Sequence, residues 1–127
     1  MEFSKEYFWD EVRDGFYVSG IMKRSLAAQM EVLGEIDKVC KRHNIRWFAD
    51  CGTLLGAVRH GGVIPWDDDV DIVMRRRDYI EFLKVAQNEL PEGYLVRNMY
   101  TEPDYYECNT RVVNRKVFSF DEEFLRK

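Results

Sequence analysis

The sequence predicts an α/β (α+β) fold in which a mixed sheet is flanked by helices. Long stretches with helical periodicity alternate with short apolar stretches typical of strands, and turn residues separate them. The 127 residues suffice for one domain, and 46% of them are hydrophobic and available for a core. The net charge of −4 argues against nucleic-acid binding, which usually requires a basic excess.

Residues 1–20 are rich in aromatic side chains and are expected to form an N-terminal arm. Glycines interrupt any long periodicity there, so we expect an irregular arm with one helical turn. Residues 21–127 form the domain proper. They open with the longest predicted helix, 21–43, which has an apolar stripe, basic residues near its C-terminal end and Asn44 as a left-handed cap.

The middle of the chain predicts a strand, a turn and a short helix. Residues 45–50 are expected to form the first strand, and Cys-Gly-Thr at 51–53 the turn. A helix over 54–60 would be capped by Thr53. Its apolar side chains are expected to face the core: Leu54, Leu55 and Val58.

The remaining elements alternate in the same way. Residues 66–74 predict the second strand. Residues 78–90 predict the second long helix, which Pro91 and Gly93 would end. Two further strands are expected over 94–99 and 108–117.

Four aspartates occupy five positions in the predicted strand over 66–74: Asp67, Asp68, Asp69 and Asp71. Because side chains alternate along a strand, Asp69 and Asp71 would lie on the same side, about 6–7 Å apart. Two carboxylates at that separation can hold a hard cation such as Mg²⁺ or Mn²⁺. A solvated acidic turn is the alternative. A calcium loop starting at Asp67 fits poorly, because Ile72 takes the place of its required glycine.

Gly52 and Thr53 lie where a predicted strand gives way to a helix. This setting suits a phosphate, because glycine removes the side-chain barrier and helix N-terminal amides donate to the anion. Arg59 is the third donor-binding candidate, since it could neutralise a phosphate or pair with an aspartate. The three arginines at 75–77 are expected to be solvated or to screen the aspartates.

The three cysteines are Cys40, Cys51 and Cys108. Their odd number and wide spacing predict reduced thiols rather than a disulfide framework or a zinc site. Reduced thiols favour a cytoplasmic location. No apolar stretch approaches the length of a membrane span, and the acidic, aromatic N-terminus is unlike a signal peptide.

The predicted order of elements resembles that of the nucleotidyltransferase fold. Within it, residues 52–72, GTLLGAVRHGGVIPWDDDVDI, closely resemble the signature of the LicD family, as does Arg-Asp-Tyr at 77–79. The resemblance extends to residues 11–18, 22–24 and 90–94, so it covers nearly the whole chain.

This resemblance implies metal-dependent transfer of a phosphorylcholine-like (phospho-alcohol) group from a CDP-activated donor such as CDP-choline. The acceptor would be a sugar of a cell-surface glycan, as in lipopolysaccharide or teichoic acid biosynthesis. Relatives in the fukutin group transfer a ribitol-phosphate instead. The resemblance also implies that Asp69 and Asp71 are catalytic and hold Mg²⁺ (or Mn²⁺), and that Gly52 and Thr53 cradle the donor diphosphate.

One departure from the family leaves two alternatives open. The fold normally supplies a third carboxylate from a later strand, but the Ile-Asp-Ile-Phe-Pro stretch that would provide it is absent. Asp121, Glu122 and Glu123 are candidate stand-ins. The alternatives are a non-catalytic truncated remnant or binding module, and a nucleotidyltransferase that uses CTP. A fold incomplete at its C-terminus would leave an open sheet edge through which the chain would self-associate.

Overall fold

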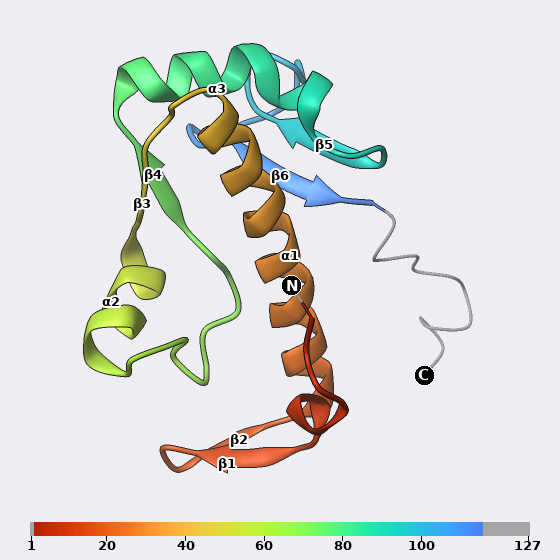
Figure 1. The fold of residues 1–127 in the computed structure, drawn as a ribbon, viewed down its shortest axis with the longest axis vertical. Helices are drawn as coiled ribbons and strands as arrows, with labels where there is room; N and C mark the ends of the chain where they lie inside the picture. The colour runs from red at the N-terminus through yellow and green to blue at the C-terminus, as the bar shows by residue number, and fades with distance from the viewer. Residues whose placement is uncertain (1, 116–127) are drawn as a thin grey trace.

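The computed structural model describes residues 2–115 and confirms the α/β class (Figure 1). Its strands pair as antiparallel two-stranded ladders: β1 with β2, β3 with β4 and β5 with β6. Asp121, Glu122 and Glu123 lie outside the described residues. The elements in order are η1 (Lys5–Phe8), β1 (Glu11–Arg13), β2 (Phe16–Val18), α1 (Gly20–Arg42), β3 (Trp47–Ala49), α2 (Cys51–Arg59), β4 (Ile72–Met74), α3 (Arg76–Glu89), β5 (Tyr94–Arg97) and β6 (Arg111–Asn114).

The N-terminal arm contains a β-hairpin, so the prediction of an irregular segment was wrong for residues 11–18. Strands β1 and β2 pair in the register Glu11↔Val18 and are joined by Asp14 and Gly15. Both turn residues have positive φ, 50° and 77°. An Asp-Gly pair tolerates these angles, which match the turn to the twist of a two-residue hairpin. The predicted helical turn is present as η1.

Helix α1 confirms the prediction for residues 21–43. It begins after Ser19, whose hydroxyl accepts a hydrogen bond from the amide of Met22 at 3.3 Å. This satisfies one of the amide groups that the first turn leaves without a helical partner. Asn44 takes the left-handed conformation, with φ 53°, as predicted. The chain then turns back, and the amide of Ile45 donates to the carbonyl of Cys40.

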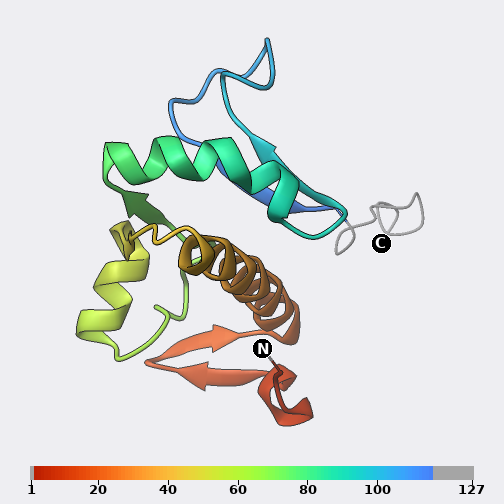
Figure 2. The same ribbon diagram turned by 45° about the horizontal axis from the view of Figure 1, so that its top comes forward.

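The core lies where α3 crosses the C-terminal end of α1, with β5 and β6 beside both helices (Figures 1 and 2). Helix α1 contributes a stripe that includes Val39 and Cys40, both almost fully buried, and α3 contributes Phe82 and Ala86. These positions recur at helical spacing, as the sequence predicted. Burial of such side chains stabilises the fold by about 1.5–3 kcal/mol for each large one.

Strands β3 and β4 form the ladder that positions the site. They pair antiparallel in the register Phe48↔Val73, so the end of β3 lies beside the start of β4. One further backbone bond extends this pairing: the amide of Asp50 donates to the carbonyl of Asp71 at 3.0 Å. The residue before α2 is thereby attached to the residue before β4.

Helix α2 does not present its leucines to the core. Leu54, Leu55 and Val58 are 47%, 45% and 79% exposed, which contradicts the prediction. The buried face of α2 is glycine instead. A Cβ at Gly56 would overlap the carbonyl oxygen of Gly62, so the following loop packs directly on the helix backbone.

The outer face of the β3–β4 ladder is also apolar and exposed, because the paired residues Phe48 and Val73 are 47% and 45% accessible. Within the described residues, each of these strands pairs only with the other. Unpaired edges beside an apolar face favour association between chains. Self-association of this chain stays a prediction, which light scattering would test.

Candidate functional site

The aspartates lie in a loop rather than in a strand. Strand β4 begins only at Ile72, so the prediction of a strand from residue 66, with aspartates alternating between two faces, was wrong. The physical reason is the length of the partner strand. Strand β3 ends at Ala49, and after Asp50 the chain turns into α2, so no strand remains for residues 66–70 to pair with. A turn at Pro65 and Trp66, closed by the amide of Asp67 on the carbonyl of Ile64, bends the segment.

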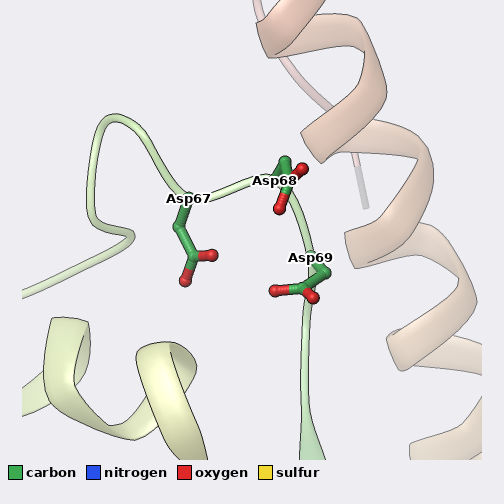
Figure 3. A group of neighbouring side chains, drawn as sticks. All are labelled: Asp67, Asp68 and Asp69. Carbon is green, nitrogen blue, oxygen red and sulfur yellow. The ribbon is translucent and has the colours of Figure 1, made fainter.

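Three carboxylates of this loop converge. One oxygen from each of Asp67, Asp68 and Asp69 lies within 4.8 Å of the others, and Figure 3 shows the three side chains pointing into a shared space beside α2. Asp69 and Asp71, the predicted pair, also interact: the charge of Asp71 helps to raise the pKa of Asp69, after the larger effect of desolvation. Asp71 itself is not one of the three convergent residues.

The first turn of α2 faces the acidic loop, residues 67–71. Gly52 lies against Asp67, because a Cβ at Gly52 would overlap a carboxylate oxygen of Asp67. Thr53 does not cap the helix, which begins earlier, after Asp50. Its hydroxyl accepts a hydrogen bond from the amide of Asp71 at 2.9 Å instead. Gly52 and Thr53 are therefore close to the aspartates, and the Thr53 hydroxyl holds Asp71 in place.

Asp50 and the loop aspartates create a negative potential at the N-terminal end of α2. The pKa of the Cys51 thiol is raised, first by the charge of Asp50 and further by Asp71 and Asp69. Desolvation, the second-largest cause, acts in the same direction. Such a concentration of negative charge is what a cation would relieve.

Gln29 on α1 is a residue of the site that the sequence analysis missed. Its side-chain amide donates to the carbonyl of Asp68 at 2.8 Å and so ties the loop to α1. Its place within a helical stripe gave no sign of this contact, which joins residues 39 positions apart.

Two groups of predicted cations do not reach the aspartates. Arg59 lies at the far end of α2, about 10 Å along the axis from Gly52, and its guanidinium donates to His60. The arginines at 75–77 are exposed, as predicted, and form no ion pair with any residue in the described range. A donor-binding role for Arg59 stays a prediction.

The donor set fits Mg²⁺ or Mn²⁺. Both prefer carboxylate oxygens. In octahedral coordination neighbouring ligand oxygens lie about 3 Å apart and opposite ones about 4 Å, since each is about 2.1 Å from the ion. The three oxygens, which lie within 4.8 Å of one another, would move closer together to share one ion. A twelve-residue EF-hand calcium loop from Asp67 does not fit, because such a loop directly follows a helix, whereas α2 ends at Arg59, and because Ile72 takes the place of the required glycine.

Comparison with known proteins decides the family. Residues 44–125 match the family model described as LicD/FKTN/FKRP, nucleotidyltransferase domain. The chain belongs to the LicD family. The matched region contains α2, the acidic loop, β4 and α3, so the family signature coincides with the geometry described above.

Curated relatives of this LicD-family chain include proteins with assigned activities. The lipopolysaccharide cholinephosphotransferase LicD of Haemophilus influenzae is 35% identical, over 68% of this chain and 36% of that protein. The human ribitol 5-phosphate transferase FKRP is 43% identical over 37% of this chain and 10% of its own length. An uncharacterized Rickettsia typhi protein is 30% identical over 81% of this chain and 32% of its length. The chain thus spans about a third of the two bacterial relatives.

No solved structure matched the chain. Among the described residues, no helix has the length and apolar character needed to cross a bilayer.

Asp69→Asn should stabilise the LicD-family chain in the absence of metal. Folding raises the pKa of Asp69, so its protonation favours the folded state at low pH, and that contribution disappears as pH rises through the raised pKa. At neutral pH, asparagine removes the repulsion. We expect a rise in Tm on the order of 2–4 °C in EDTA, shrinking toward acid pH, by thermal denaturation. An unchanged difference across pH would contradict this assignment.

Proposed function

We propose that this chain carries the metal- and donor-binding part of an enzyme that transfers a phosphorylcholine-like group from a CDP-activated donor to a sugar of a glycan. The observation that carries the proposal is the convergence of the Asp67, Asp68 and Asp69 carboxylates, with Asp71 adjacent, against the first turn of α2. The named activities of the relatives, cholinephosphotransferase and ribitol 5-phosphate transferase, support the reaction class.

In this proposal Asp69 and Asp71 are the main metal ligands, and Asp67 and Asp68 complete the acidic site. A bound Mg²⁺ or Mn²⁺ would neutralise the charge of the donor phosphates. Thr53 keeps Asp71 in place through its hydroxyl, and Gln29 does the same for Asp68. Gly52 leaves room for the loop to approach the helix N-terminus, whose amides favour anions.

We further propose that the chain acts in the cytoplasm. All three cysteines are free, and two of them, Cys51 and Cys108, are exposed. Exposed free thiols fit a reducing compartment. Fluorescence of a tagged chain in fractionated cells would test this location, and recovery with the periplasmic or secreted fraction would contradict it.

Calorimetry tests the proposal directly. CDP-choline is titrated into the chain in EDTA, then in Mg²⁺ and in Mn²⁺. We expect the metals to tighten binding at least tenfold, because a cation between carboxylates and phosphates relieves repulsion on both sides. Equal affinity with and without metal would overturn the proposal.

Product analysis then separates the three functions. Mass spectrometry of CDP-choline and a glycan acceptor incubated with the chain should reveal CMP and a phosphocholine-modified sugar. Binding without turnover would favour the binding-module alternative. Release of diphosphate from CTP, without reaction of CDP-choline, would favour a nucleotidyltransferase.

A further inference from the structure

A cavity lies between the N-terminal arm, the first turns of α1 and the loop that leads to the aspartates. Its polar lining comes from Tyr7, Arg13, Lys23 and Asp67, and its apolar lining includes Leu26 and Ile64. Asp67 also belongs to the convergent carboxylates, so the cavity adjoins the proposed metal site. This juxtaposition was not predicted, because the arm and the loop are about fifty residues apart in the sequence.

Lys23 is the unusual member of the lining. Its side chain is only 5% exposed, and its ammonium lies 3.1 Å from Glu11 and 5.5 Å from the ring centre of Tyr7. Lysine is rarely buried unless paired. An ammonium has three N–H donors, and within the described residues Glu11 is the one carboxylate paired with it. Lys23 is thus a hydrogen-bond donor at the cavity that Glu11 fixes in place and that is partly desolvated.

The cavity is bordered by charges of both signs. Lys23 and Arg13 are positive, while Asp67 and Glu11, which contacts both cations, are negative. The carboxylate of Asp67 would repel an anionic ligand, and the ammonium of Lys23 would repel a cationic one. A hydroxyl group suits both sides, because it accepts from the ammonium and donates to the carboxylate. The apolar lining suits the C–H groups of the carbon that bears such a hydroxyl.

The size of the cavity limits what enters it. Its volume is about 30 Å³, and one water needs about 10–15 Å³. It therefore admits a hydroxyl and the carbon that bears it rather than a whole sugar ring. The rest of such a ligand would extend out of the opening.

We propose that this cavity binds the hydroxyl-bearing end of a neutral, polyhydroxylated ligand through Lys23 and Asp67. If the proposed function holds, on which this part rests, that ligand is the glycan acceptor, and its hydroxyl lies beside the metal site. Lys23 and Asp67 are then binding residues that orient the acceptor.

Nuclear magnetic resonance of the ¹⁵N-labelled chain in EDTA tests the proposal. Glucose, galactose and ribitol are titrated separately, and inorganic phosphate and tetramethylammonium serve as charged comparisons. We expect at least one neutral polyol to shift amides of the cavity, such as those of Met22, Leu26 and Val63, more than either ion does. Lys23→Met should weaken this binding about tenfold or more, the usual size of a charge-assisted hydrogen bond.

Lys38→Met is the matched control, because Lys38 lies on the same helix but is 64% exposed and far from the cavity lining. It should leave polyol binding unchanged. If Lys23→Met fails to fold, Asp67→Asn replaces it, since asparagine keeps the side-chain shape at the cavity. The absence of cavity shifts with all three polyols, or equal binding by these variants, would overturn the proposal. No metal or nucleotide is present, so this outcome is separate from the test of phosphoryl transfer.

Discussion

Replacing Asp71 or Asp69 by asparagine should abolish the gain in CDP-choline affinity that Mg²⁺ produces in the wild-type chain. Asparagine keeps the shape of aspartate but removes the negative charge that a hard cation requires. Loss of residues that only support metal ligands already costs about 10–100-fold in metal affinity, so loss of a ligand should cost at least as much. Calorimetry with and without Mg²⁺ measures the effect.

Two further variants serve as a second test and as a control for this prediction. Asp68→Asn removes a member of the convergent group, so it should also reduce the Mg²⁺ effect. Asp104→Asn makes the same chemical change at an exposed turn far from the site in sequence, and it should leave the effect intact. If Asp69→Asn, Asp71→Asn and Asp104→Asn retained equal metal dependence, the acidic loop would not be the metal site.

Gly56→Ala should destabilise the fold although alanine is the better helix former. A Cβ at this position would overlap the carbonyl oxygen of Gly62 and lie 3.1 Å from the amide nitrogen of Ile64. Both are backbone atoms, so relief requires the loop to move away from α2. Overpacking of this kind costs about 1–3 kcal/mol, against a propensity gain of about 1 kcal/mol. We expect a net loss of up to about 2 kcal/mol in urea denaturation.

Gly34→Ala is the matched control for this change. Gly34 also lies within a helix, α1, but a Cβ there would meet nothing within 4 Å. Alanine should therefore stabilise the chain by about 0.5–1 kcal/mol. The loop that packs on Gly56 leads to Asp67. Gly56→Ala should therefore also weaken metal binding, and Gly34→Ala should not. Equal stabilisation by both substitutions would show that α2 does not pack on the loop as described.

The predictions that succeeded rest on interactions between residues near one another in the sequence. The apolar stripe of α1 and its left-handed Asn44 are decided within a few turns of helix, and so is the stripe of α3 that buries Phe82 and Ala86. The hairpin that was not predicted also depends on residues near one another in the sequence. The Asp-Gly pair at residues 14 and 15 is a strong hairpin signal, but its glycine was interpreted only as an interruption of periodicity.

The predictions that failed depended on partners that periodicity does not identify. Apolar spacing placed Leu54, Leu55 and Val58 toward the core, but the loop after α2 packs on Gly56 instead. Alternation over residues 66–74 suggested a strand, but β3 is too short to pair with the first five of them. A strand needs a neighbour, and the length of the neighbour was not evident from either segment alone.

The amino-acid sequence by itself determined the two long helices and where they end, though not where α2 begins, and it placed Gly52, Thr53, Asp69 and Asp71 in the family signature. Only the tertiary structure decided that Asp67 and Asp68 join Asp69, and that Gln29 and the cavity around Lys23 adjoin them. Helix formation depends on contacts three or four residues apart, which a sequence displays. The site depends on the antiparallel register of β3 with β4, which brings distant segments together.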